Sequence, residues 1–223
     1  MYVQSFANSV HWRAKIMETK NIMIVGVGGQ GSLLASKILG HLLLSQGYDV
    51  KVSEVHGMSQ RGGSVVTYVR YGDKVYSPIV DKGEADVIIS FELLEAARWV
   101  EYLKKDGVLI TNTQQINPMP VITGASKYPK DIKKKLMDMG VQVEGFDALT
   151  LAEEVGSPKC VNIVLLGHLS HHFDFTEEEW HEAIRSCVKE KFVDMNIKAF
   201  ELGRRGGYTV LNRIGDFITN VMS

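Results

Sequence analysis

Residues 21–31 read NIMIVGVGGQG, a short apolar run that ends in a loop with four glycines. The apolar run over 21–27 predicts a buried strand, because strands of a parallel sheet are covered on both faces. After the loop, Ser32–Leu44 carries apolar residues at helical spacing, and Gly47 is the kind of residue that commonly ends a helix. A strand, a glycine loop and a helix in this order are typical of the start of a Rossmann-like domain.

The segments that follow alternate between strand and helix patterns, which is typical of a doubly wound fold. We therefore expect an α/β, Rossmann-like domain with a mostly parallel sheet. One departure is expected, because Lys74–Val80 resembles a short strand in a hairpin with Ser64–Arg70. The other expected strands are 48–55, 86–90, 108–112 and 141–146, and the expected helices of this part are 92–105 and 132–139.

The last third of the chain, from about residue 147, gives helix patterns and no strong strand pattern. Thr176 and Glu179 match a capping box, in which each side chain satisfies a backbone N–H at a helix start. We expect residues 21–223 to form one domain with this helical C-terminal extension. Residues 1–20 are expected to be a leader, disordered or not native to the protein, because the compact pattern begins at Asn21.

The composition argues against several classes of partner. Among 223 residues, 25 are basic and 26 acidic, so no basic excess points to nucleic acid or to an anionic membrane surface. No apolar run reaches the roughly 18–20 residues that span a bilayer. Cys160 and Cys187 lie far apart and cannot form a zinc or iron–sulfur site by themselves. We expect free thiols in a cytoplasmic protein, and no metal bound by this chain.

The glycine loop leaves several functions open. In dinucleotide-binding enzymes such a loop approaches a pyrophosphate, and an acid about 20 residues further on, here Glu54, holds the ribose. A stand-alone NAD or ATP enzyme is therefore one alternative, although the paired CxxC motifs of many adenylating enzymes are missing. A loop kept for packing is another. The residues that would contact an anion, coenzyme A or a nucleotide are Gly26, Gly28, Gly29, Gln30 and Gly31.

A second polar loop lies in Glu54–Gly63, which reads EVHGMSQRGG. Together with GVGGQG, the strand SVVTYVR and the later EADVIISFE, it resembles the gamma-type domain of the 2-oxoacid:ferredoxin oxidoreductases. The HGMSQRGG form of the loop, with Cys160–Asn162 and Leu165–Gly167 downstream, looks most like the beta subunits of indolepyruvate oxidoreductases. The resemblance runs from about Asn21 to about Gly207.

The resemblance implies that the chemistry is divided between subunits. In that family thiamine diphosphate and the iron–sulfur clusters lie in other domains or subunits, so a large subunit that carries them is the expected partner. The complex would oxidatively decarboxylate an aryl pyruvate with coenzyme A to an acyl-CoA and pass electrons to ferredoxin. This chain would be inactive alone, with no catalytic residue of its own. Ligand or partner contacts are expected from Glu54, His56, Met58, Ser59, Gln60, Arg61, Gly62 and Gly63.

Arg61 is the first of these residues to test. Its guanidinium can bind a carboxylate or a phosphate through two parallel hydrogen bonds, and the adjacent glycines permit close approach of a partner. The alternative is that Gln60 and Arg61 only tie the loop to nearby carbonyls or acids. His56 could act as a general acid or base, but a lone loop histidine is more often a hydrogen-bonded structural residue.

Two further groups receive structural interpretations. Glu92 and Glu95 follow a buried strand and are expected to favour the positive start of their helix. His168 and His172 share a helix face beside His171 and could bind a metal ion. No carboxylate pattern in the sequence completes such a site, and we therefore predict none.

Overall fold

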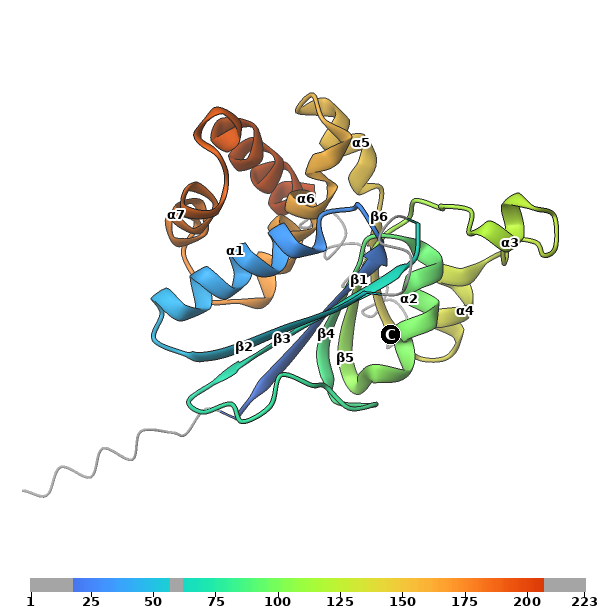
Figure 1. Cartoon of the computed structure of the whole chain (residues 1–223), viewed down its shortest axis with the longest axis horizontal. Coiled ribbons are helices and arrows are strands. Elements are labelled where there is room, and N and C mark those ends of the chain that lie inside the picture. Colours follow the sequence, from blue (N-terminus) through green and yellow to red (C-terminus); the bar gives the residue numbers. More distant parts are fainter. Residues whose placement is uncertain (1–17, 57–61, 207–223) are drawn as a thin grey trace, which may run out of the picture.

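The computed structural model describes residues 18–56 and 62–206. Its six strands are β1 (Lys20–Val27), β2 (Asp49–His56), β3 (Ser64–Gly72), β4 (Ala85–Ser90), β5 (Leu103–Asn112) and β6 (Gln142–Phe146). They form one sheet in the order β2-β3-β1-β4-β5-β6 (Figure 1). β1, β4, β5 and β6 pair in parallel, whereas β3 lies antiparallel between β1 and β2. The expected Rossmann-like, mostly parallel sheet is thus confirmed.

Helices cover both faces of this sheet (Figure 1). One face carries α1 (Ser32–Ser45), α5 (Ala148–Glu154), α6 (Val161–Leu169), α7 (Glu177–Cys187) and a helix over 193–206. The other face carries α2 (Leu93–Trp99) and α4 (Ile132–Asp138), and the short α3 (Met119–Ile122) projects from the edge. Single 3₁₀ turns are η1 (Val100–Tyr102), η2 (Pro158–Cys160), η3 (Ser170–His172) and η4 (Glu190–Phe192). Within the described residues, none of the helices is long and apolar enough to cross a membrane.

The sequence of β1 explains why it lies inside the sheet. Successive side chains of a strand point to opposite faces. Ile22 and Ile24 pack with α1 and α6 on one face, and Met23 and Val25 pack with α2 and α4 on the other. All four side chains are buried, as expected for a strand with helices on both sides.

The C-terminal helices form a second layer around α6, whose nine residues are all buried. Two glycines allow α6 and the helix over 193–206 to touch through their backbones. A Cβ atom at Gly203 would lie 1.9 Å from the carbonyl oxygen of Val164, and one at Gly167 would lie 2.1 Å from that of Phe200. The predicted helical C-terminal part is confirmed, as is the capping box of Thr176 and Glu179 at the start of α7.

The expected hairpin of Ser64–Arg70 with Lys74–Val80 is wrong. β3 continues to Gly72 and pairs with β2 instead, and residues 74–80 form no strand. The Arg70 guanidinium donates hydrogen bonds to the carbonyl oxygens of Ser77 and Ile79, at 3.1 and 2.6 Å. A side chain therefore satisfies backbone groups that a strand partner would otherwise have to satisfy.

The expected helix over 92–105 is too long. α2 ends at Trp99, one 3₁₀ turn follows, and β5 begins at Leu103. Leu103 pairs with Ala85, and its side chain packs against the core on the α2 side of the sheet. Pairing with β4 thus outweighs the local helix pattern of the segment, since tertiary contacts readily override helix propensity.

Candidate functional site

Ligands of open α/β sheets bind beyond the carboxyl ends of the parallel strands. Here the ends of β1, β4 and β5 meet the start of the antiparallel β3, because Val27 pairs with Ser64 and Ser90 with Thr111. A cavity of about 420 Å³ opens at this edge, and we call it the carboxyl-edge cavity. Its lining includes Gly62–Ser64, which lead into β3, the α2 cap Glu92, Glu95 and Arg98 of α2, and residues 116–120.

The glycine loop beside this cavity is packed against its own protein. Gln30 accepts a hydrogen bond from the Val27 N–H at 2.7 Å and donates one to the Phe91 carbonyl at 3.1 Å. The Gly31 carbonyl accepts a bond from the Asn162 side chain at 3.0 Å, and Gly31 has a φ of +88°. A Cβ at Gly31 would lie 2.5 Å from the Asn162 amide nitrogen. Close packing against α6 therefore explains this glycine.

The two loops singled out in the sequence lie together. Gly28 donates through its N–H to the Gly63 carbonyl at 2.8 Å, and the Gly62 N–H donates to the Gly28 carbonyl at 3.5 Å. Glu54, near the end of β2, accepts a hydrogen bond from the Ser32 hydroxyl at 3.2 Å, beside the start of α1. The glycine loop, Glu54 and Gly62–Gly63 thus form one continuous surface.

Part of the second loop lies outside the described residues. The backbone of His56 ends β2 opposite Val65. Met58, Ser59, Gln60 and Arg61 fall within 57–61, which the structure does not describe, so their predicted contacts stay predictions.

Glu92 is a buried carboxylate that the sequence reveals only as a helix start. It lies at the start of its helix, as expected, and caps α2, because its side chain accepts a hydrogen bond from the Glu95 N–H at 3.0 Å. It also accepts bonds from the Ile116 N–H at 3.0 Å and from the Tyr128 hydroxyl. Burial, together with the bond to Glu92, raises the pKa of Tyr128. Glu92 thereby connects α2 to the loop before and after α3.

Glu95, also buried, connects α2 to β3 behind the same cavity. It accepts hydrogen bonds from the Ser64 hydroxyl and from Arg98, the latter at 2.8 Å. The indole N–H of Trp99 donates to the Ser64 oxygen at 3.3 Å. Ser64 was not a sequence candidate. Its position directly after Gly62–Gly63, at the first residue of a strand, is the signal that would have identified it.

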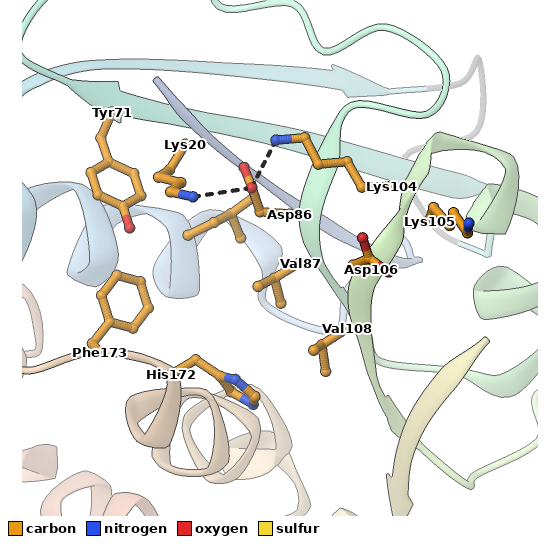
Figure 2. Close-up of a pocket in the computed structure, with 12 residues that line it drawn as sticks. Lys20, Tyr71, Asp86, Val87, Lys104, Lys105, Asp106, Val108, His172 and Phe173 are labelled. Atoms are coloured by element: carbon orange, nitrogen blue, oxygen red, sulfur yellow. Dashed lines mark hydrogen bonds and ion pairs between the residues drawn. The ribbon is translucent and has the colours of Figure 1, made fainter. Parts of the chain in front are cut away.

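A second cavity, of about 550 Å³, lies at the opposite, amino edge of the sheet (Figure 2). Asp86 at the start of β4 accepts bonds from Lys104 at 2.8 Å and from Lys20 at 3.5 Å, so its charge is balanced. Figure 2 shows His172 and Phe173 on the other side of this amino-edge cavity, with Val87 and Val108 between. No residue that the sequence analysis assigned to a ligand or partner contact lines it.

The structure corrects the prediction that no carboxylate completes the histidine cluster. The Glu144 side chain of β6 reaches both rings: its Oε2 lies 2.6 Å from Nε2 of His168 and 2.9 Å from Nε2 of His172. Burial alone would raise the pKa of Glu144, but the two histidine bonds outweigh it and lower the pKa to about 2. The only sequence signal was an acid at a core-facing position of an otherwise apolar strand.

The family model and the known proteins that the chain resembles agree with one another. Residues 21–206 match the family model described as pyruvate ferredoxin/flavodoxin oxidoreductase. The chain is 48% identical over 200 residues to the indolepyruvate oxidoreductase subunit IorB of Thermococcus kodakarensis, covering 87% of this chain and 99% of that one. It is 41% identical over 187 residues to the subunit of the same name from Archaeoglobus fulgidus, covering 82% and 92%.

Solved structures share the fold. The gamma subunit of a keto/oxoacid ferredoxin oxidoreductase from Geobacter sulfurreducens superposes with a TM-score of 0.64 at 24% identity, covering 85% of this chain and 99% of that one. A 2-oxoglutarate:ferredoxin oxidoreductase from Magnetococcus marinus gives a TM-score of 0.67 at 19% identity. That match covers 86% of this chain but 31% of the other, so the same fold also occurs as one part of a longer chain.

Proposed function

Because the chain belongs to the pyruvate ferredoxin/flavodoxin oxidoreductase family, we propose that it is the small subunit of a 2-oxoacid:ferredoxin oxidoreductase that acts on indolepyruvate. The observation that carries the proposal is the 48% identity to an indolepyruvate oxidoreductase subunit across 99% of that subunit's length. The same family holds a pyruvate synthase subunit that is 28% identical to this chain. The greater identity favours an aryl pyruvate over pyruvate.

The complex would convert a 2-oxoacid and coenzyme A to an acyl-CoA and CO₂, and the two electrons released would reduce ferredoxin. The residues of this chain do not fit the redox centres of that reaction. An iron–sulfur cluster commonly takes four thiolates, and the chain contains two cysteines. Burial raises the pKa of both Cys160 and Cys187, which disfavours the thiolate. Clusters and thiamine diphosphate would therefore belong to a larger partner subunit in the same cytoplasmic complex.

We call the surface formed by the glycine loop, Glu54 and Gly62–Gly63 the carboxyl-edge surface, and we assign it to contact with the partner or with coenzyme A. The glycine loop and Gly62–Gly63 are bonded to each other there, and Arg61 directly precedes them in the chain. Arg61 can supply the cation for a phosphate of coenzyme A or a carboxylate of the partner. The apolar side chains of Met119 and Ile122, each 65% exposed on α3, extend the surface beyond the carboxyl-edge cavity.

A stand-alone nucleotide enzyme receives less support from the same residues. Gln30 and Asn162 occupy hydrogen-bonding positions around the glycine loop. Glu54, the candidate ribose ligand, bonds Ser32. The loop is thus explained by packing, without a bound dinucleotide.

Reconstitution tests the proposal. The chain would be co-expressed with its candidate large subunit and purified without oxygen, and indolepyruvate- and coenzyme-A-dependent reduction of ferredoxin would be measured. We expect turnover from the complex, none from the small chain alone, and lower kcat/KM for pyruvate. Arg61→Ala should lower turnover or assembly, and Lys130→Ala, at an exposed position between α3 and α4, serves as the control. Tight NAD or ATP binding by the chain alone, or turnover that is independent of it, would contradict the proposal.

A further inference from the structure

Three metal-ligating side chains converge beside the amino-edge cavity. His168 in α6 and His172 in η3 are four residues apart and lie on one side of a continuous helical segment. Glu144 reaches them from β6, and the candidate ligand atoms of the three residues all lie within 4.8 Å of one another. We propose that Glu144, His168 and His172 bind a single Zn²⁺ ion. The inference is independent of the proposed function.

The hydrogen bonds of this cluster leave buried polar atoms unsatisfied. Glu144 and His168 are completely buried, yet both histidine bonds fall on the same carboxylate oxygen. The other oxygen of Glu144 has no partner in the described part of the chain and is therefore available as a ligand atom. Buried polar atoms without partners are rare in native proteins and usually indicate an ion, a water molecule or a functional role.

The charge of Glu144 also favours a cation. Within residues 18–56 and 62–206, its ion partners are two imidazoles rather than a lysine or an arginine. A buried carboxylate needs a compensating charge, and imidazoles supply one only when they are protonated. A divalent ion would balance the carboxylate, and both Nε2 atoms would face that ion with their lone pairs.

The ligand set and its spacing suit zinc. Two imidazoles and one carboxylate are a common zinc triad that leaves a fourth position for water or substrate. Tetrahedral bonds of about 2.0–2.2 Å place ligand atoms roughly 3.4 Å apart, so the present 2.6 and 2.9 Å separations would widen by roughly 0.5–0.8 Å. His172, with 23% of its side chain exposed, has the freedom to make the smaller of these movements, whereas the larger one lies between the buried Glu144 and His168.

The amino-edge cavity supplies the entry path and the fourth position. Figure 2 shows the His172 ring at the cavity, across from Asp86 and its lysine partners. Because Lys20 and Lys104 already pair with Asp86, this acid does not compete for the ion. A water molecule or a small anionic ligand in the cavity would complete the coordination.

A second group of potential ligands fits less well. Glu177, His181 and Glu201 also lie close together, but the side chains of the two acids are 51% and 32% exposed. Arg204 lies 3.9 Å from Glu177 and Arg205 lies 3.6 Å from Glu201. Both carboxylates thus have cationic partners already. This group provides the matched control.

Metal titration of the full chain tests the site. The chain would be stripped with a chelator, and Zn²⁺ binding would be measured by calorimetry, with Co²⁺ absorption in the visible range as the signature of tetrahedral coordination. We expect one ion per chain. Loss of an outer-shell partner weakens metal sites by about 10–100-fold, so removal of a ligand in Glu144→Gln or His172→Gln should weaken binding at least about tenfold. His181→Gln should bind like the unmodified chain.

The variants distinguish zinc binding at Glu144 from a hydrogen-bonded network and from zinc binding at the group around His181. Circular dichroism would establish that each variant is folded; if Glu144→Gln is not, His172→Gln decides alone, because its side chain is partly exposed. Equal Zn²⁺ affinity in the unmodified chain and His172→Gln, or no tetrahedral Co²⁺ spectrum, would show that the cluster is a hydrogen-bonded network and overturn the proposal. Loss of binding in His181→Gln alone would assign the ion to the other group and overturn it equally.

Discussion

The backbone N–H of Gly28 donates a hydrogen bond to the carbonyl oxygen of Gly63 at 2.8 Å. Gly28 belongs to the loop after β1, and Gly63 precedes β3, which pairs antiparallel with β1. The bond therefore joins two glycine-containing loops whose bonded residues are 35 positions apart in the sequence. A change in the conformation of one loop should therefore alter the conformation of the other, and with it the shape of the carboxyl-edge surface.

Gly31→Ala should destabilise the chain more than Gly29→Ala. Both glycines have positive φ angles, +88° and +100°, so each alanine carries a backbone cost of about 1–2 kcal/mol. At Gly29 a Cβ meets no atom within 4 Å, whereas at Gly31 it lies 2.5 Å from the Asn162 side chain. Overpacking adds about 1–3 kcal/mol to the second variant. Urea unfolding midpoints measure the difference; equal midpoints would refute the packing role of Gly31.

Removal of the Glu92 carboxylate should loosen the α3 loop. Glu92→Ala takes away the cap of α2 and the acceptor for Ile116 and Tyr128, and should lower the free energy of unfolding by about 2–4 kcal/mol. Tyr128→Phe removes one of these bonds and should cost about 1 kcal/mol. The half-exposed Glu101, changed to alanine, should have little effect. Hydrogen exchange of the Ile116 amide gives a local measure, and unchanged protection in Glu92→Ala would contradict the assignment.

The sequence predicts elements better than it predicts contacts between them. The apolar run before Gly26 and the capping box at Thr176 are local patterns, and both correspond to the structure. The strand expected at Lys74–Val80 does not form, and Arg70 instead satisfies carbonyl groups of that segment. No local pattern in the sequence predicts this contact. Glu144 illustrates the same limit, since its histidine partners lie 24 and 28 residues further along the chain.

The sequence identifies both loops, but it does not predict that they are hydrogen-bonded to each other. Strand patterns alone leave open which strand lies beside β1. The antiparallel insertion of β3 between β1 and β2 decides that Gly62–Gly63 reach the glycine loop. Register depends on contacts across the whole sheet, and a single sequence does not supply these.

Met119→Asp should weaken assembly with the large subunit without unfolding the chain. Met119 lies on α3 beside the carboxyl-edge cavity and is 65% exposed, so the new charge costs little in the free chain. In an apolar contact the desolvated charge should weaken binding at least about fivefold, the equivalent of 1 kcal/mol. Met139→Asp is the matched control, because Met139 is 71% exposed but follows α4 near the start of β6, at the amino edge. Biolayer interferometry with the large subunit measures both, and equal losses would exclude α3 as the specific contact.

Glu144 should make the stability of the chain sensitive to acid. Its pKa in the folded chain, about 2, lies below the ordinary value of 4.5, so the ionised carboxylate stabilises the folded state fully above about pH 4.5. This contribution, at most about 3 kcal/mol, is lost as the pH falls from about 4.5 towards 2.

Glu144→Gln carries no titrating group at this position. Its deficit in unfolding free energy relative to the unmodified chain should therefore be largest near neutral pH and should shrink between about pH 5 and pH 3. Urea unfolding at a series of pH values, with chelator present to remove any metal contribution, measures the deficit. The exposed Glu153→Gln on α5 should show no such pH dependence. A deficit that stays constant across this range would mean that the histidines do not stabilise the ionised form of Glu144.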